Sequence, residues 1–251
     1  MKSPIKDTRF LNKSISYFKK IIPKDSTVNT FGIFSGIPEI SLSSSGITVN
    51  AFTSKTVIYQ FWYCLFENKQ RLYNILTDDS FRFNGDRDYK LLQRTLPSCE
   101  DAYMRSSLFF MLNRCSQSGQ ISCGEFDPDG YTSLALRNLM MFRKPELFNI
   151  FFYKENHKAM KDADYLLFHS LNFSYNLTNL GSINSYDGYN FNSRKLRTLM
   201  ESESDKKIIM SYRYHPALAK FYKDYQLKMI NKYGNQTSIT DECVEVVVAN
   251  F

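Results

Sequence analysis

The apolar residues of this chain recur at intervals that predict alternating helices and strands. Helical spacing runs from Asp7 to Ile22, where Pro23 ends it, and again from Thr53 to Leu76. Between these helices, Thr27 to Phe34 and Gly46 to Asn50 are rich in β-branched and aromatic residues, which is typical of strands. This part of the chain therefore predicts two strands, joined by a turn and a short helix, followed by a long helix that covers the sheet.

The later part of the chain continues the alternation. Strand patterns cover Tyr165 to His169, Lys207 to Tyr212 and Cys243 to Asn250, while helical spacing covers Phe151 to Lys161 and Pro216 to Asn231. Strands separated by helices indicate an α/β fold with a largely parallel sheet, and the valine-rich last strand suits an antiparallel addition at the edge. We therefore expect a mostly parallel, Rossmann-like sheet with an antiparallel edge strand, flanked by helices.

Shorter helical segments fill the middle of the chain. Tyr89 to Leu96 and Ala102 to Arg114 have helical spacing, and a polar stretch follows from Cys115 to Tyr131. We expect residues 1–80 and 151–251 to form one α/β domain that is interrupted by a helical insertion at residues 81–150.

Composition and length exclude several classes of protein. The chain has 251 residues, of which 43% are hydrophobic, so it can bury a large core and is too apolar for a disordered chain. It contains no apolar run of the length that a membrane span needs, and residues 1–23 lack the apolar core of a signal peptide. Its five cysteines and three histidines are not spaced as a disulfide framework or a zinc module. We expect an intracellular protein (cytoplasm or host nucleus) or a virion component that is not secreted, has no membrane partner and binds no metal.

The net charge of +7 suits a partner that carries phosphates. Basic residues concentrate in the middle of the chain, where they would contact DNA phosphates; the candidates are Arg87, Lys90, Arg94, Arg105, Arg114 and Arg137. Acidic residues are interleaved with them, so a solvated face of mixed charge is the competing interpretation.

Several motifs occur in an order that resembles a known family. Phe34-Ser35-Gly36-Ile37-Pro38-Glu39-Ile40-Ser41-Leu42 is followed by Val49-Asn50-Ala51, by Phe109 to Arg114 with Gly119, and by Ile208 to Tyr212. This order is similar to that of the Dam-type adenine-specific DNA methyltransferases, which transfer a methyl group from S-adenosylmethionine to the exocyclic amine of adenine. The resemblance implies a Rossmann-like methyltransferase sheet and a target-recognition region at residues 81–150. It also places Phe34 and Gly36 at the cofactor loop, and Asn50 and Ala51 at the ribose site.

The chain departs from this family at three positions. Ile37 and Pro38 stand where the cofactor loop has a second glycine, and Ala51 stands where an acid holds the ribose. His169-Ser170-Leu171-Asn172 stands where the family has its catalytic Asp-Pro-Pro-Tyr motif. A register shifted by three residues would instead offer Asn172 as acceptor and Tyr175 as the ring that stacks on a flipped adenine.

These departures favour a catalytically inactive methyltransferase homologue, a pseudoenzyme, that acts as a DNA-binding or assembly component and needs no cofactor. Its expected partners are DNA or the protein subunits of a larger complex. One alternative is a divergent but active adenine methyltransferase that binds S-adenosylmethionine and uses Asn172 and Tyr175. A second alternative is a structural subunit of a larger assembly such as a virion. For His169, a structural role with satisfied hydrogen bonds and a role as a base both remain open. Asp127-Pro128-Asp129-Gly130-Tyr131 has the composition of a turn.

Overall fold

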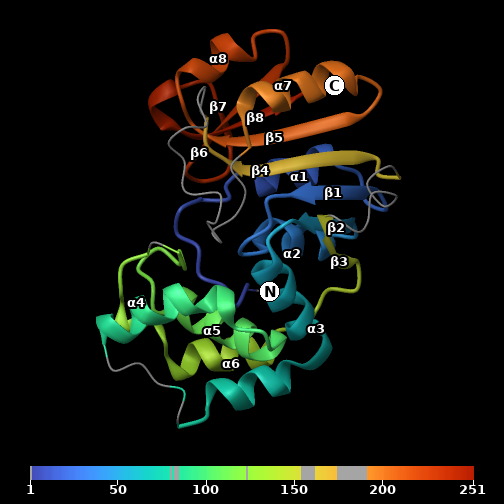
Figure 1. Cartoon of the computed structure of the whole chain (residues 1–251). Helices are drawn as coiled ribbons and strands as arrows, with labels where there is room; N and C mark the ends of the chain where they lie inside the picture. Colours follow the sequence, from blue (N-terminus) through green and yellow to red (C-terminus); the bar gives the residue numbers. More distant parts are fainter. Residues whose placement is uncertain (1, 80, 82–84, 123, 154–161, 174–190) are drawn as a thin grey trace.

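The computed structural model contains one eight-stranded sheet with the order β3-β2-β1-β4-β5-β8-β6-β7 (Figure 1). It describes residues 2–79, 81, 85–122, 124–153, 162–173 and 191–251. The strands are β1 (Thr27–Phe31), β2 (Thr48–Thr53), β3 (Phe148–Phe152), β4 (Tyr165–Leu171), β5 (Lys207–Arg213), β6 (Gln226–Asn231), β7 (Gln236–Thr237) and β8 (Cys243–Ala249). Strands β3, β2, β1, β4 and β5 are mutually parallel, whereas β8 is antiparallel to both β5 and β6. The predicted fold class, a mostly parallel α/β sheet with antiparallel strands toward one edge, is confirmed.

Helices cover both faces of the sheet. The α-helices are α1 (Ile15–Ile21), α2 (Ile37–Ser43), α3 (Thr56–Leu76), α4 (Asp86–Thr95), α5 (Ala102–Arg114), α6 (Ser133–Met141), α7 (Ser193–Ser202) and α8 (Ala217–Phe221), and short 3₁₀ turns lie at Leu96–Ser98, Pro128–Gly130 and Thr240–Glu242. Buried residues of α1 and α2 pack with Val28, Val49 and Leu167. Residues of α7 and α8 pack with Phe31 and Phe168, which alternate with the first set along β1 and β4 and therefore point to the opposite face.

The helical region from α4 to α6 shares its core with the sheet domain. Phe61 of α3 contacts Phe109 and Phe110 of α5, and the same cluster includes Phe34 beyond β1 and Phe148 of β3. Figure 1 shows α5 and α6 beside α3, away from the sheet. Because β3 already begins at Phe148, the sheet resumes within the range that we assigned to the insertion.

Three sequence-based element assignments were wrong. Residues 7–12 are not helical, and α1 begins only at Ile15. The helix expected over Pro216 to Asn231 ends at Phe221, and Gln226–Asn231 forms strand β6. Phe151 and Phe152, which we assigned to a helix, belong to β3, while residues 154–161 lie outside the described residues. In each case pairing with a neighbouring strand or segment outweighs a helical spacing that a few apolar residues produce by chance.

Candidate functional site

The order of the strands creates a crevice at the carboxyl ends of β1 and β4. These strands are neighbours, but β1 leads through α2 to β2 on one side whereas β4 pairs with β5 on the other. Open α/β sheets bind ligands at such a reversal of strand order, because the chains that leave the two strands diverge there. Glu39 of α2 and His169 of β4 meet at this point.

A chain of hydrogen bonds joins four side chains in the crevice. The hydroxyl of Thr30 donates to Oε1 of Glu39 over 3.0 Å, and the same oxygen lies 2.7 Å from Nε2 of His169. The other ring nitrogen of His169, Nδ1, lies 3.0 Å from Oγ of Ser170. The carboxylate can only accept hydrogen bonds, so the network assigns the proton of a neutral His169 ring to Nε2 and leaves Nδ1 able to accept from Ser170.

Glu39 is fully buried yet holds its charge. Burial raises the pKa of its carboxyl. The charge that His169 carries when protonated and its hydrogen bond, helped by the hydroxyl of Thr30, outweigh this effect and bring the pKa below its ordinary value. Its second oxygen, Oε2, has no hydrogen-bond partner within the described residues. A buried carboxylate with one oxygen committed to a histidine orients that histidine firmly, since any rotation of the ring would leave the charge unpaired.

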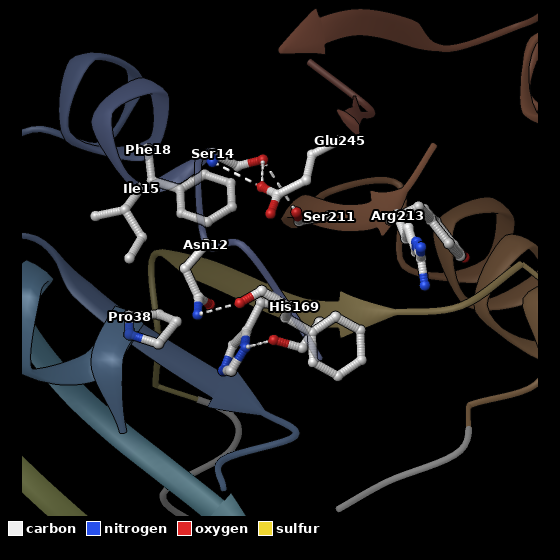
Figure 2. A pocket seen from close by; sticks show the side chains of 12 residues that line it. Asn12, Ser14, Ile15, Phe18, Pro38, His169, Ser211, Arg213 and Glu245 are labelled. Atoms are coloured by element: carbon white, nitrogen blue, oxygen red, sulfur yellow. Dashed lines mark hydrogen bonds between the residues drawn. The ribbon is translucent and has the colours of Figure 1, made fainter. Parts of the chain in front are cut away.

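A second buried carboxylate lies near the first network. Glu245 of β8 accepts hydrogen bonds from the backbone N–H of Ser14 over 2.8 Å and from the Ser14 hydroxyl over 2.6 Å, and Ser211 of β5 donates to that hydroxyl over 3.1 Å. Between the two networks lies a cavity of about 10 Å³, roughly the space of one water molecule. Figure 2 shows His169 and Glu245 on its opposite sides.

The inner cavity adjoins a larger groove. This groove has a volume of about 480 Å³ and runs between residues 8–11 and the facing residues 213–214 and 243–245. Phe10, Arg213 and Glu245 line both spaces. Arg213 ends β5 with its side chain exposed, so it brings a positive charge to the rim of the crevice.

At the predicted cofactor loop, side chains of the protein itself lie against the backbone. Gly36 has a φ of 67°, in the left-handed region that glycine tolerates, and a Cβ added there would lie 2.6 Å from Cζ2 of Trp62. The indole N–H of Trp62 donates to the carbonyl of Phe34 over 3.2 Å. On the N-terminal side, the guanidinium of Arg9 lies 4.6 Å from the centre of the Phe34 ring, and the Ser3 hydroxyl donates to the carbonyl of Ser35.

The predicted ribose site lies within β2 and not at its end. Strand β2 continues to Thr53, and Ala51 is fully buried in its middle. The amide of Asn50 donates to Asn29 of β1 over 3.2 Å and accepts from Asn149 of β3 over 3.2 Å. These two residues therefore contribute to strand packing, and the expectation that they end a strand was wrong.

The predicted catalytic loop is mainly strand. His169, Ser170 and Leu171 form the end of β4, and exposed Asn172 follows it. Tyr175, which the shifted register pairs with Asn172, lies outside the described residues.

The six candidate DNA contacts fall into two groups. Arg87, Lys90 and Arg94 on α4, and Arg137 on α6, are exposed. Arg105 instead donates to the carbonyl of Cys99 over 2.6 Å and to Gln60 over 2.8 Å. Arg114 donates to the carbonyl of Gly130 over 3.2 Å, and burial lowers its pKa.

The segment Asp127 to Tyr131 is a turn, as its composition predicts. The carboxylate of Asp127 accepts from the backbone N–H of Asp129 over 3.2 Å and pairs with Lys6 over 3.0 Å. The hydrogen bond from Lys6 lowers the pKa of Asp127, and the short 3₁₀ turn Pro128–Gly130 follows it.

Sequence reasoning placed His169 and Ser170 in a decayed loop and missed their partner. The resemblance to the methyltransferases includes Glu39 only as one residue of the cofactor loop. A signal was present: a carboxylate in the first turn of a short helix, followed by Ile40 and Leu42, is bound to be partly buried and must find a partner. Glu245 lies between valines in a predicted strand, so burial of its carboxylate and the need for a partner are expected there too.

Comparison with family models and with curated proteins yields no match for this chain. Throughout the described ranges, no set of three or more histidine, cysteine, aspartate or glutamate side chains is placed to hold a metal ion. Every helix within these ranges is too short or too polar to traverse a lipid bilayer.

Proposed function

We propose that the protein is a catalytically inactive homologue of the adenine-specific DNA methyltransferases and acts as a DNA-binding or assembly component. The observation that carries this proposal is the packing of Trp62 against the loop Phe34 to Gly36. In the methyltransferase family, the methionine part of S-adenosylmethionine lies against the backbone of the corresponding loop. Here the indole ring occupies the space beside Gly36.

The other side of the loop supports the same proposal. Ile5 is buried in the same cluster as Phe34 and Trp62, and Arg9 covers the Phe34 ring. A cofactor would have to displace buried aromatic and aliphatic side chains, whose burial is worth about 1.5–3 kcal/mol each. Ala51, which has no polar side-chain atom, would offer nothing to the ribose hydroxyls in return.

The exposed basic residues of α4 supply a surface for DNA. Arg87, Lys90 and Arg94 are spaced three and four residues apart, so they share one face of the helix. Lys90 is paired with Asp86 over 2.5 Å, but both side chains are more than half exposed, and such surface pairs contribute little. A DNA phosphate can therefore replace Asp86 as the partner of Lys90 with a small loss of free energy.

Calorimetric titration of the full chain with S-adenosylmethionine tests the cofactor part of the proposal. We expect no binding heat up to millimolar cofactor, because the loop is filled. Micromolar binding would contradict the proposal and favour the active enzyme. In that case, methylation of an adenine-containing duplex and its loss in the Asn172→Ala and Tyr175→Ala variants would be the next measurements.

Fluorescence anisotropy with a labelled duplex at several salt concentrations tests the DNA part. We expect binding that weakens linearly on a logarithmic salt scale, because phosphate contacts release counterions. Absence of binding at low salt, together with a large oligomer in sedimentation, would contradict DNA binding and favour a purely structural subunit.

A further inference from the structure

The end of β4 carries a side-chain arrangement that methyl transfer does not use. Ser170, His169 and Glu39 form a continuous hydrogen-bonded series with separations of 3.0 and 2.7 Å. We propose that Ser170 is a nucleophile, that His169 is its general base, and that Glu39 positions His169, so that the crevice takes small carboxylic esters. The proposed function excludes methyl transfer only, so this proposal assigns the crevice a different reaction and does not depend on the proposed function.

The direction of the hydrogen bonds suits this chemistry. Glu39, which also accepts from Thr30, holds the proton of a neutral His169 ring on Nε2, so Nδ1 accepts from the Ser170 hydroxyl. A serine, a histidine within hydrogen-bond reach and a buried carboxylate that orients the histidine are the components of an activated hydroxyl nucleophile. Glu39 is fully buried and His169 is 4% exposed, so water does not compete for their hydrogen bond.

The backbone at Ser170 is strained. Ser170 has a φ of 58°, and the register between β4 and β5 shifts between Phe168 and Leu171. The other described non-glycine residues with positive φ are Asn12 and Asp25, whose residue types tolerate that region, whereas serine is less favoured there. Strain of this kind is concentrated at functional sites, where it directs a side chain out of the regular strand.

Ser170 borders a space of about one water molecule, and the larger groove adjoins this space. Ser170 itself is only partly buried and lines the inner cavity together with Ser211 and Arg213. The adjoining groove can accept the remainder of an ester. Arg213 brings a positive charge to this cavity and would balance negative charge that develops on the carbonyl oxygen.

The reaction that we propose is acyl transfer followed by hydrolysis. Oγ of Ser170 attacks the carbonyl carbon, its proton passes to Nδ1 of His169, and the bond to the leaving alkoxide breaks as His169 returns the proton to it. Water then attacks the acyl-serine through the same base, which releases the carboxylic acid and restores Ser170.

A fluorophosphonate probe tests the nucleophile in the full-length protein. Attack by Ser170 forms an Oγ–P bond and expels fluoride, and the proton leaves through His169. We expect one covalent adduct that peptide mass spectrometry locates at Ser170, together with a burst of nitrophenol from p-nitrophenyl acetate. No adduct at Ser170 after prolonged exposure, or an adduct only at other residues, would overturn the proposal.

Three variants separate catalysis from a structural role. Ser170→Gly removes the hydroxyl but suits the positive φ, so it should keep the thermal midpoint and lose both the adduct and the burst. Glu39→Gln should slow labelling by at least about tenfold in the folded protein. Ser44→Ala, at an exposed serine after α2, should label like the unmodified chain. Equal labelling rates in the Glu39→Gln variant and the unmodified protein would show that Glu39 does not position His169, and would overturn its assigned role.

Discussion

At the scale of single residues, Glu39 places a charged carboxylate in an apolar interior. Glu39 is fully buried, and the hydrogen bonds from His169 and Thr30 to its oxygen Oε1 stabilise its charge. Removing one partner of a buried charge costs more than the pair contributes, because the remaining group is left without solvation. The pair is therefore sensitive both to substitution and to acid.

We expect Glu39→Gln to lower the free energy of unfolding by about 1–3 kcal/mol at pH 7, because a charge-assisted hydrogen bond becomes a neutral one. The folded-state pKa of Glu39 lies below its ordinary value. Its contribution is therefore complete above its unfolded-state pKa of about 4.3 and is lost as the pH falls through the folded-state pKa. Urea denaturation at pH 7 and in acid measures the free energy of unfolding of both proteins. The difference between the variant and the unmodified protein should be smaller in acid. A constant difference across this range would contradict the assignment.

The sequence could locate His169 and Ser170 but not their chemistry. The sequence shows both residues at the end of an apolar strand and places them in the predicted catalytic loop. That His169 meets Glu39, 130 positions earlier, depends on β1 and β4 being adjacent, which no local pattern encodes. Tertiary proximity of this kind becomes visible only when the strand order is known.

At the scale of elements, segments with a clear apolar pattern were predictable, whereas strands β3 and β6 were not. The helix α5 lies at the residues that its spacing predicts. The helix α3 starts three residues later than predicted and has a kink at Asn68, where φ is −151° and ψ is 77°. Residues Gln226–Asn231, which form strand β6, were assigned to a helix because Leu218, Phe221, Tyr222 and Tyr225 before them fit a helical interval. Their strand conformation comes from pairing with β8, a contact between distant parts of the chain.

We expect the exposed basic face of α4 to contribute most of the salt-dependent affinity for DNA. Replacing Arg87, Lys90 and Arg94 together by alanine should weaken binding and reduce the slope of the logarithmic salt dependence by about 1 for each phosphate that is no longer neutralised. A matched variant that replaces exposed Lys220, Lys223 and Lys228 removes the same charge from α8, β6 and the turn between them. It should bind almost as well as the unmodified chain. Equal weakening in both variants would indicate an effect of net charge alone.

At the scale of the whole molecule, the N-terminal segment connects the helical region to the sheet domain. The backbone of Lys6 exchanges two hydrogen bonds of 2.8 Å with the side chain of Asn113 on α5. Further along, the backbone of Thr8 donates to Ser118 over 3.1 Å, and Ser14 reaches Glu245 of β8. Residues 3–14 therefore contact three separate parts of the fold without forming a helix until Ile15.

Asn113 is the residue on which this connection depends most. Asn113→Ala removes partners from the N–H and carbonyl of Lys6 and from the carbonyl of Gly119, so we expect a loss of about 1–3 kcal/mol in the free energy of unfolding. Denaturant titration measures it, and hydrogen exchange should show faster exchange at residues 5–8. Asn138→Ala, at an exposed site on α6, should change neither. Unchanged stability of the Asn113 variant would mean that the segment is held by other contacts.

The position of β8 has a consequence for synthesis on the ribosome. Strand β8 separates β5 from β6, yet both of these precede it in the chain. Until β8 emerges, each has an open edge with unpaired backbone groups, and such edges associate readily with other chains. The contact of Ser14 with Glu245, which spans 231 positions, can form only after the same strand has emerged. The final steps of folding thus join one of the earliest helices to one of the last strands, and during that interval the nascent chain depends most on protection from aggregation.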